Sequence, residues 1–351
     1  MKLWEDKVRR TIPYTPGEQP QAADLIKLNT NENPYPPAPG VEKVKNAMDT
    51  DLLRLYPDPA AGVLVDALAD FYHVDKNQVF VGVGSDDVLS VAFLTFFNSE
   101  KPVLFPDITY SFYPVWAGIY RIPYETCPLD EDFRIRPEDY YKDNGGIVFP
   151  NPNAPTAIYE SLDTVEDILK HNRDVVVIVD EAYIDFAGKS ALELIHKYDN
   201  LLVVQTFSKS RSMAGIRIGY AIGCPELIQA MNDVKYSINS YTMNLPSLLM
   251  GAEAVKDKDY FYDCVDRIKA TRERTKKRLA ALGFEFPDSQ ANFIFARHPR
   301  YDGKALFEAL RRENIFVRYF NQPRIDQYLR ITVGTDEQMD VLIKFLEKYT
   351  A

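Results

Sequence analysis

The apolar residues of this chain form short continuous runs that alternate with longer segments of helical spacing. Between about residues 60 and 235 the runs are rich in β-branched side chains, which is typical of strands buried on both faces of a sheet. This alternation predicts βαβ units and therefore a largely parallel sheet covered by helices. The expected strands are Val79–Val83, Pro102–Phe105, Ile147–Phe149, Val175–Val179, Leu201–Gln205 and Ile218–Ile222.

The pattern changes after this region. A long, charged, amphipathic stretch at 247–282 predicts helix, and shorter elements follow it without the βαβ rhythm. Their order predicts a second, smaller α+β domain. These elements are a strand at Asn292–Ala296, a helix at 303–313, strands at Ile315–Tyr319 and Leu329–Val333, and a terminal helix from Asp336.

The first 40 residues are rich in proline, asparagine and charge, and this composition predicts an extended arm rather than a packed element. A short helix is expected at 41–53, and the Tyr56-Pro-Asp-Pro59 segment interrupts it. We therefore expect an arm at 1–40, a large α/β domain at 41–245 and a small α+β domain at 246–351. Residues 41–55 are expected to pack against the small domain.

The length and net charge of the chain limit the number of domains and the kinds of partner that we expect. The chain has 351 residues, enough for a large core and two domains. Its net charge of −10 disfavours nucleic acid as a partner, so phosphate recognition would depend on a few locally placed arginines. No stretch has the length and apolarity of a membrane span or of a signal peptide, so no membrane partner is expected.

The spacing of the cysteines and histidines argues against a disulfide-bonded protein and against a metal-binding protein. Cys127, Cys224 and Cys264 are far apart and form no CxxC pair, which favours a reduced, cytoplasmic protein. The four histidines make no metal-ligand spacing with them, so no metal site is expected.

The most informative segment runs from Leu201 to Gly219, where an apolar run leads into a hydroxyl-rich turn that holds Lys209. A lysine at the mouth of a buried strand is costly unless its pKa falls or it is covalently occupied, as in lysines that form Schiff bases. Neighbouring hydroxyls and Arg217, eight residues later, suit an anion such as a cofactor phosphate. Taken alone, the segment also fits an ordinary surface loop.

Asp180 closes the apolar run Asp174-Val-Val-Val-Ile-Val. Its carboxylate should project into the crevice outside the strand's carboxyl end, where open α/β sheets bind ligands. An acid there is suited to keep a pyridine nitrogen protonated, and Tyr183 could place a phenol near the ring's own hydroxyl. The alternative is that Asp180 caps a helix that follows the strand.

These segments resemble, in order and spacing, the fold-type I aminotransferases that depend on pyridoxal 5'-phosphate (PLP), in the class I/II superfamily, and are similar to the histidinol-phosphate aminotransferase family. The resemblance implies a large domain with a mainly parallel, seven-stranded sheet flanked by helices, and a small α+β domain. It covers nearly the whole chain. Besides the Asp180 and Lys209 segments, it is carried by Pro13-Tyr-Thr-Pro-Gly17, Lys27-Leu-Asn-Thr-Asn-Glu-Asn-Pro-Tyr35, Tyr56-Pro-Asp-Pro59, Val81-Gly-Val-Gly-Ser-Asp-Asp87, Asp107-Ile-Thr-Tyr-Ser-Phe-Tyr113, Val317-Arg318 and Leu329-Arg-Ile-Thr-Val-Gly334.

The glycine turn after Val79 could begin a dinucleotide-binding fingerprint, but the third glycine of that motif is replaced by Asp87. What remains is a strand, a tight turn and the start of a helix, whose free N–H groups can bind a phosphate. Ser85 or Asp86 could also simply cap this helix, and both roles can hold together.

The resemblance assigns the cofactor contacts. Lys209 would hold PLP covalently, Asp180 would face its ring nitrogen and Tyr183 its ring oxygen. Tyr110 would stack on the ring, and Tyr56 would reach the phosphate of the neighbouring subunit, which implies a homodimer. The phosphate would lie among Gly84, Ser85, Asp86, Ser208 and Arg217, with Thr206 as a weaker candidate.

The expected substrate-binding residues are Tyr14, Asn33, Arg318 and Arg330, and residues 29–33 are expected to line the same mouth. The two arginines lie on neighbouring predicted strands, and two guanidiniums in one pocket suit a phosphate or carboxylate. By resemblance, Arg330 would bind a substrate carboxylate, while Tyr14 and Arg318 would bind the phosphate of histidinol phosphate. The arginines could instead form salt bridges on an exposed strand.

The chain departs from the family pattern after Phe149. Similar enzymes usually carry Asn-Asn-Pro-Thr-Gly where this chain has Asn153-Ala154-Pro155-Thr156-Ala157. Ala154 cannot supply the amide that normally bonds the ring oxygen. Tyr183 would then hold that oxygen alone, or Asn153 or Asn151 would substitute through a shifted backbone. Ala157 replaces a turn glycine and would be strained at a positive φ.

The resemblance implies a reaction in which histidinol phosphate and 2-oxoglutarate give imidazole-acetol phosphate and glutamate, a step of histidine biosynthesis. Lys209 would act as general base and acid. An aromatic-amino-acid aminotransferase would share the core residues but not the phosphate-binding role of Tyr14 and Arg318. A threonine-phosphate decarboxylase would release carbon dioxide and need no oxo acid. A non-catalytic PLP-binding module is disfavoured by the intact Lys209 and Asp180.

Overall fold

The computed structural model describes residues 2–21 and 24–351. Over this part of the chain the central sheet has seven strands, in the order β2-β8-β7-β6-β5-β3-β4. Strand β8 runs opposite to the other six, which share one direction, so the sheet is mainly parallel, as the sequence predicts. Its strands are β2 (Val79–Gly82), β3 (Val103–Pro106), β4 (Tyr124–Cys127), β5 (Gly146–Pro150), β6 (Val177–Asp180), β7 (Leu201–Thr206) and β8 (Gly219–Ile222).

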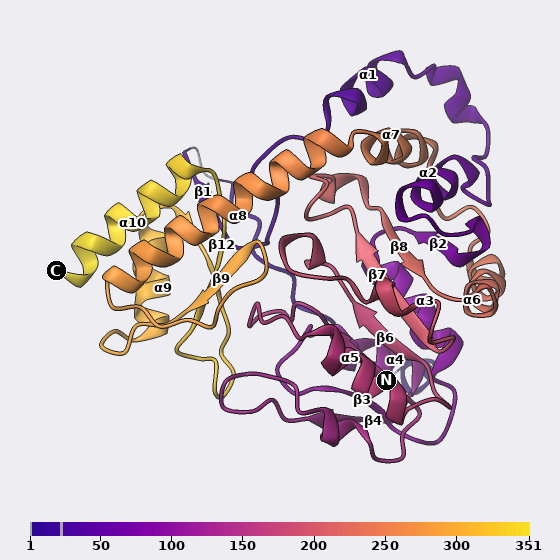
Figure 1. The fold of residues 1–351 in the computed structure, drawn as a ribbon, viewed down its shortest axis with the longest axis horizontal. Helices are drawn as coiled ribbons and strands as arrows, with labels where there is room; N and C mark the ends of the chain where they lie inside the picture. The colour runs from indigo at the N-terminus through magenta and orange to yellow at the C-terminus, as the bar shows by residue number, and fades with distance from the viewer. Residues whose placement is uncertain (1, 22–23) are drawn as a thin grey trace.

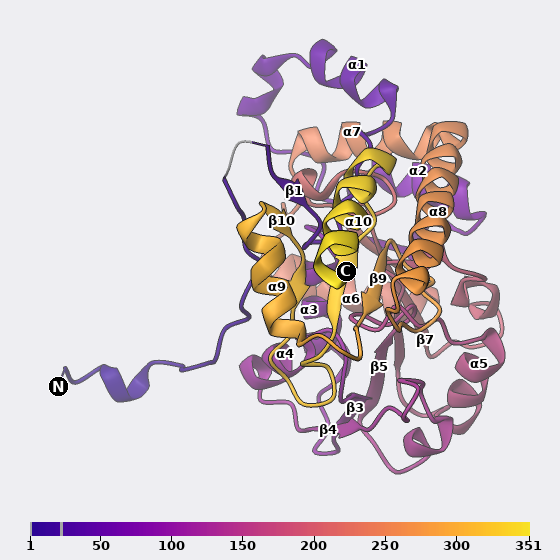
Figure 2. The same ribbon diagram turned by 90° about the vertical axis from the view of Figure 1, so that its left-hand side faces the viewer.

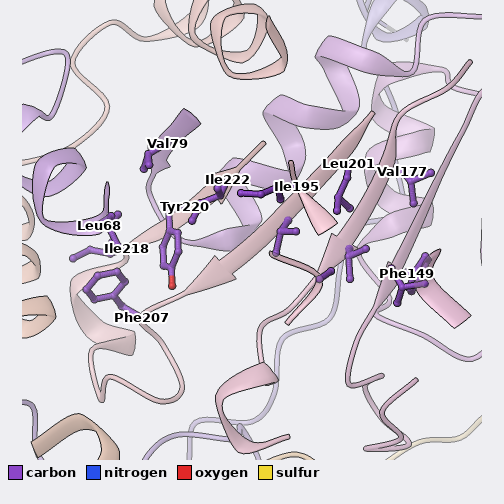
Figure 3. Close-up of a cluster of buried hydrophobic side chains, with 14 of the residues drawn as sticks. Leu68, Val79, Phe149, Val177, Ile195, Leu201, Phe207, Ile218, Tyr220 and Ile222 are labelled. Atoms are coloured by element: carbon purple, nitrogen blue, oxygen red, sulfur yellow. The ribbon is translucent and has the colours of Figure 1, made fainter. Parts of the chain in front are cut away.

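Apart from β4 at the sheet edge, the strands are buried on both faces because successive side chains enter two different cores. In β7, Leu201 and Val203 belong to one hydrophobic cluster, and Leu202 and Val204 belong to another. Figure 3 shows part of the first cluster, which includes Leu201.

Helices cover both faces of this sheet (Figure 1). Side chains of α2 (Gly62–Tyr72), α5 (Leu162–His171) and α7 (Leu245–Lys256) enter the first cluster. Those of α3 (Ser85–Phe96), α4 (Tyr113–Tyr120) and α6 (Pro225–Ile238) enter the second. Among the described residues, no helix is both long and apolar enough to span a bilayer.

A smaller α+β unit follows, with its own hydrophobic cluster. Its antiparallel sheet has the order β11-β12-β9, and β12 joins the two outer strands. Its elements are α8 (Lys258–Ala281), β9 (Phe293–Ala296), α9 (Gly303–Arg312), β10 (Ile315–Phe316), β11 (Arg318–Tyr319), β12 (Leu329–Thr332) and α10 (Asp336–Thr350).

The single strand expected at Ile315–Tyr319 is divided. Ile315 and Phe316 pair in parallel with β1 (Ile26–Lys27), whereas Arg318 and Tyr319 pair with β12. Within the segment expected to be an arm, β1 therefore adds a strand beside the small domain. The first few described residues, around Glu5–Lys7, extend away from the body, as Figure 2 shows, whereas Tyr14 lies against Phe112.

Where residues 41–55 pack depends on the domain boundary, because their partner α7 lies almost wholly within the range 246–351 expected for the small domain. Helix α1 (Pro39–Ala47) packs against α7, and its Val41 belongs to the core of the large domain. Because α7 also packs against α2, we propose a boundary between the domains near the start of α8. The short 3-10 helices are η1 (Glu5–Lys7), η2 (Thr50–Arg54), η3 (Lys76–Gln78), η4 (Pro137–Tyr140), η5 (Ile184–Phe186), η6 (Ala191–Leu194) and η7 (Ala214–Ile216).

Candidate functional site

A cavity of about 230 Å³ opens where the carboxyl ends of β6 and β7 meet the start of α3 and the strands of the small domain. Residues from segments far apart in the sequence meet there. Twelve of the residues that the sequence singles out line it: Tyr14, Ser85, Asp86, Tyr110, Asp180, Tyr183, Thr206, Ser208, Lys209, Arg217, Arg318 and Arg330.

Lys209 follows the end of β7, and its Nζ donates a hydrogen bond of 3.0 Å to the carbonyl of Thr30. Withdrawal from solvent, and then the positive charge of Arg330, lower the pKa of Lys209 to about 8. A lysine with this pKa carries a substantial neutral fraction near pH 8 and can act as a nucleophile.

Asp180 is the last residue of β6, and its Oδ2 accepts a bond of 3.0 Å from the hydroxyl of Tyr113. Its Oδ1 accepts from the N–H of Ala182 at 3.3 Å, so Asp180 also caps the following turn. Burial raises the pKa of Asp180 to about 6, partly opposed by these two bonds. A buried acid of this kind gains most from a cationic partner, such as a protonated ring nitrogen.

The start of α3 forms a cradle for an anion. Gly84 is the N-cap residue with φ of 83°, and the first N–H groups of the helix, at Ser85 and Asp86, have no partner within the helix. The fit is tight, because a Cβ on Gly84 would lie 2.5 Å from Nη2 of Arg217. A Cβ on Gly219 would lie 2.3 Å from the backbone nitrogen of Ser85.

Arg217 joins this cradle to the hydroxyl-rich turn. Its Nη2 lies 3.2 Å from Oδ2 of Asp86, and its Nη1 lies 3.4 Å from Oγ of Ser208. Thr206 donates to the same Oγ at 3.0 Å. The Tyr110 hydroxyl donates to Oδ1 of Asp86 at 2.7 Å, which anchors this aromatic ring at the wall of the cavity.

The arginines of the small domain have different surroundings. Arg330 donates from Nη2 to the carbonyl of Asn29 at 2.9 Å, while its buried Nε has no partner among the residues that the structure describes. Withdrawal from solvent lowers the pKa of Arg330. Arg318 is more open, and it makes a long bond of 3.4 Å to the carbonyl of Thr15. Tyr14 stacks on Phe112 with ring centroids 4.2 Å apart.

Four predicted residues lie off the cavity wall. Gly84 lies behind Ser85 as the N-cap. Asn33 donates to the carbonyls of Lys209 and Ser210, so it holds the lysine segment in place. Asn153 donates to the carbonyl of Ile108 and to Thr156, and these bonds occupy its amide nitrogen. Tyr56 is 80% exposed and stacks on Tyr241 with centroids 4.5 Å apart.

The two alanines that depart from the family pattern have different environments. Ala154 is buried and lines the cavity, where it offers a methyl group. Ala157 has φ of 65°, a left-handed conformation that costs an alanine roughly 1–2 kcal/mol. A glycine would avoid this strain.

Sequence reasoning missed several polar groups near the cavity. Tyr113 lies within the quoted aromatic segment, three residues after Tyr110, but its bond to Asp180 has no local signal. Glu181 follows Asp180 and is buried among three hydrogen-bond donors. Residues 29–33 are expected at the mouth of the cavity, but the hydrogen bond from Asn31 to the hydroxyl of Tyr183, 152 residues away, has no local signal.

The residues present fit PLP. The helix start and Arg217 suit its phosphate, Asp180 suits a protonated ring nitrogen, and the amine of Lys209 suits its aldehyde. The buried hydroxyl of Thr109 and Nε of Arg330 line the same cavity without partners, as expected of groups that a ligand satisfies. In the part of the chain that the structure describes, no cluster of acidic, histidine or cysteine side chains could hold a metal ion.

Known proteins resemble this chain over nearly its full length. A sequence model of the aminotransferase class I and II family matches residues 23–346. The histidinol-phosphate aminotransferase of Lactococcus lactis subsp. cremoris (strain MG1363) is 52% identical over 346 residues, which cover 99% of this chain and 97% of that protein. The histidinol-phosphate aminotransferase of Pseudomonas syringae pv. syringae (strain B728a) is also 52% identical, and the match covers 98% of this chain and 99% of that protein.

The same fold occurs in solved structures. The histidinol-phosphate aminotransferase from Sinorhizobium meliloti in complex with pyridoxal-5'-phosphate superposes with a TM-score of 0.84 at 23% identity. The superposition covers 92% of this chain and 90% of that one. At this identity the likeness shows a shared fold.

Proposed function

Because the chain belongs to the class I and II aminotransferases, and among them to the histidinol-phosphate aminotransferases, we propose that it transfers the amino group of histidinol phosphate to 2-oxoglutarate. Imidazole-acetol phosphate and glutamate are the products, and PLP is the cofactor. One observation carries the proposal: a lysine with a lowered pKa shares one cavity with an anion-binding helix start and with two arginines.

Each cofactor contact has a physical basis in this chain. Lys209 would hold PLP covalently, and the N–H groups at the start of α3, with Ser208 and Arg217, would bind its phosphate. Asp180 would keep the ring nitrogen protonated, and Tyr110 would cover the ring. When bound, PLP supplies an electron sink for the pair that remains when a proton leaves the substrate carbon.

Lys209 is suited to move that proton. When the substrate amine has displaced it, the neutral Nζ would accept the proton from the carbon that bears the amino group and, as general acid, would deliver it to the cofactor carbon C4′. The carbonyl of Thr30, 3.0 Å from Nζ, gives the released amine a hydrogen-bond acceptor. Water would then release the oxo product by hydrolysis, while the amino group stays on the cofactor until 2-oxoglutarate takes it up in the second half of the reaction.

We further propose a cytoplasmic homodimer in which Tyr56 completes the site of the other subunit. The Tyr56 ring is 80% exposed and is not part of the cavity of its own chain. Leu52, Leu53 and Leu55 expose further apolar surface on the same segment, and contact with a second copy would cover it.

Visible absorption tests the proposed reaction. The PLP-loaded protein is titrated with histidinol phosphate in the absence of an oxo acid. The proposal predicts stoichiometric loss of the band of the lysine-bound cofactor, and recovery of this band when 2-oxoglutarate is added. A band that responds only to phenylalanine or tyrosine would instead indicate an aromatic-amino-acid aminotransferase. Release of carbon dioxide from threonine phosphate would indicate a decarboxylase.

A further inference from the structure

The hydroxyl of Tyr183 is tied to the small domain through one asparagine. Nδ2 of Asn31 donates to the Tyr183 hydroxyl at 3.0 Å, and Oδ1 of Asn31 accepts from the hydroxyl of Thr332 at 3.1 Å. All three residues are buried, and Thr332 is the last residue of β12. This relay connects the sheet of the small domain to the wall of the cavity.

The hydrogen bonds of the relay form one consistent set of donors and acceptors. The hydroxyl oxygen of Thr332 accepts from the backbone N–H of Asn31 at 3.0 Å, so its hydrogen is free for Oδ1 of Asn31. With its oxygen facing Thr332, the Asn31 amide presents its NH₂ group to Tyr183. Tyr183 therefore accepts a bond on its oxygen, and its own hydrogen remains available to an acceptor inside the cavity.

Ala154 and Asn153 do not offer a second hydrogen-bond donor that could replace the Tyr183 hydroxyl. Ala154 lines the cavity with a methyl group, and the amide nitrogen of Asn153 is occupied by Ile108 and Thr156. Tyr183 lines the same cavity and is held from the side by Phe293, with ring centroids 5.0 Å apart at 83°. The contact with Phe293 holds the Tyr183 ring, and the bond from Asn31 orients its hydroxyl.

We propose that Asn31, oriented by Thr332, is a positioning residue that keeps Tyr183 as the hydrogen-bond donor to the ring oxygen of PLP, in place of the amide that Ala154 lacks. This inference rests on the proposed function, because the acceptor belongs to the cofactor. The backbone of Asn31 suits the role, since its φ of 56° is a conformation that asparagine tolerates better than most residues.

The pH titration of the bound cofactor reports on this bond. A donor draws electron density from the ring oxygen, which then holds the proton on the neighbouring lysine nitrogen less strongly. Loss of the donor therefore raises the pH at which the visible band titrates. We expect a rise of roughly half to one pH unit in Asn31→Gly, from the usual strength of one hydrogen bond. Glycine suits the positive φ and removes only the side chain.

A double-mutant design separates the relay from a general structural effect. Tyr183→Phe should raise the titration midpoint, and Asn31→Gly should add no further shift in the Tyr183→Phe background. Thr332→Val keeps the side-chain volume and should give a smaller rise, because the Asn31 amide is then free to turn. Thr332→Val also tests the relay if Asn31→Gly fails to fold.

Asn292→Ala is the matched control. It removes a bond of 3.0 Å to the backbone oxygen of Asn31 but leaves the side-chain relay intact, so the midpoint should not change. The inference is overturned if Asn31→Gly leaves the midpoint unchanged, if its shift persists without the Tyr183 hydroxyl, or if Asn292→Ala shifts it equally. Because no substrate is present, failure of the histidinol-phosphate reaction alone leaves this result standing. Absence of the visible band in the wild-type protein would overturn both proposals.

Discussion

Arg318 and Arg330 lie directly opposite each other on the antiparallel strands β11 and β12. The two positive charges converge on one cavity, and the proximity of Arg318 helps to lower the pKa of Arg330, after the larger effect of burial. Like charges this close destabilise the empty site, and an anionic substrate would relieve the repulsion. The pair is therefore suited to bind a dianion such as a phosphate monoester.

The first prediction concerns Arg318→Gln. We expect kcat/KM for histidinol phosphate to fall roughly tenfold to a hundredfold, because a hydrogen bond to a charged group contributes about 1.5–3 kcal/mol. Activity on unphosphorylated histidinol should change little, so the preference for the phosphorylated donor should shrink. Arg312→Gln, at an exposed position of α9, is the control. An equal loss on both donors would contradict a phosphate-specific role.

The second prediction concerns the pH dependence of cofactor loading. Only the neutral amine of Lys209 attacks an aldehyde, and burial lowers its pKa to about 8. When cofactor-free protein is mixed with PLP, the rate constant for growth of the visible band should rise as the pH increases through about 8 and then level off. Nα-acetyl-lysine serves as the reference, because an ordinary lysine titrates near pH 10.4. A rate that follows this reference would argue against a perturbed lysine.

Much of the fold is predictable from this sequence because the central strands are continuous apolar runs. β2, β3, β5, β6, β7 and β8 each overlap an expected strand. β4 was missed because its first three residues, Tyr124–Thr126, are exposed at the sheet edge and form no apolar run. The break between β10 and β11 depends on pairing with β1, a tertiary contact that local periodicity does not encode.

The third prediction concerns Gly84→Ala. The added Cβ would lie 2.5 Å from Nη2 of Arg217, and φ of 83° strains any alanine there. We expect the backbone to shift and the dissociation constant for PLP to rise at least tenfold. A loss of about 1.4 kcal/mol in binding free energy is enough for that factor. Binding of pyridoxal, which lacks the phosphate, should be affected less. Gly118→Ala is the control, since nothing lies within 4 Å of its added Cβ. Equal dissociation constants for PLP in Gly84→Ala and Gly118→Ala would contradict the proposal that the start of α3 binds the phosphate.

The fourth prediction links Glu181 to the pH dependence of stability. Burial raises its pKa from an ordinary value of 4.5 to about 7, partly opposed by bonds from Ser190, Ala191 and Gln205. Its contribution to stability is fully present below pH 4.5 and is lost as the pH rises through 7. Glu181→Gln cannot ionise, so its free energy of unfolding should decline less between pH 5 and pH 8, by up to about 3 kcal/mol.

Denaturant unfolding at one protein concentration measures this difference. The Glu181→Gln variant will be less stable in absolute terms, because an amide cannot accept every bond that the carboxylate accepts. The test is therefore how steeply the free energy of unfolding changes with pH in each protein. Parallel curves for the two proteins would show that Glu181 does not titrate in this range.

The candidate site is only partly predictable for a similar physical reason. Lys209 and Asp180 stand at strand ends, where local pattern indicates a ligand, and both line the cavity. Asn33 and Asn153 belong to polar segments whose side chains bond the nearby backbone, and sequence alone does not reveal which amide faces the cavity. The role of Asn31 depends on Thr332, 301 residues later, which only the folded structure brings near.

The last prediction tests whether Tyr56 acts across a subunit interface. Tyr56→Ala and Lys209→Ala should each lose most activity as separate homodimers. When the two variants are unfolded, mixed and refolded together, half of the dimers will carry one subunit of each kind. One site of such a dimer combines an intact Lys209 with the intact Tyr56 of the other subunit, so roughly a quarter of all sites should recover. If Tyr56 served the site of its own chain, no mixed site would be intact, and mixing would restore nothing. Recovery measured against the two unmixed variants, refolded in the same way, therefore decides between a shared and a self-contained active site.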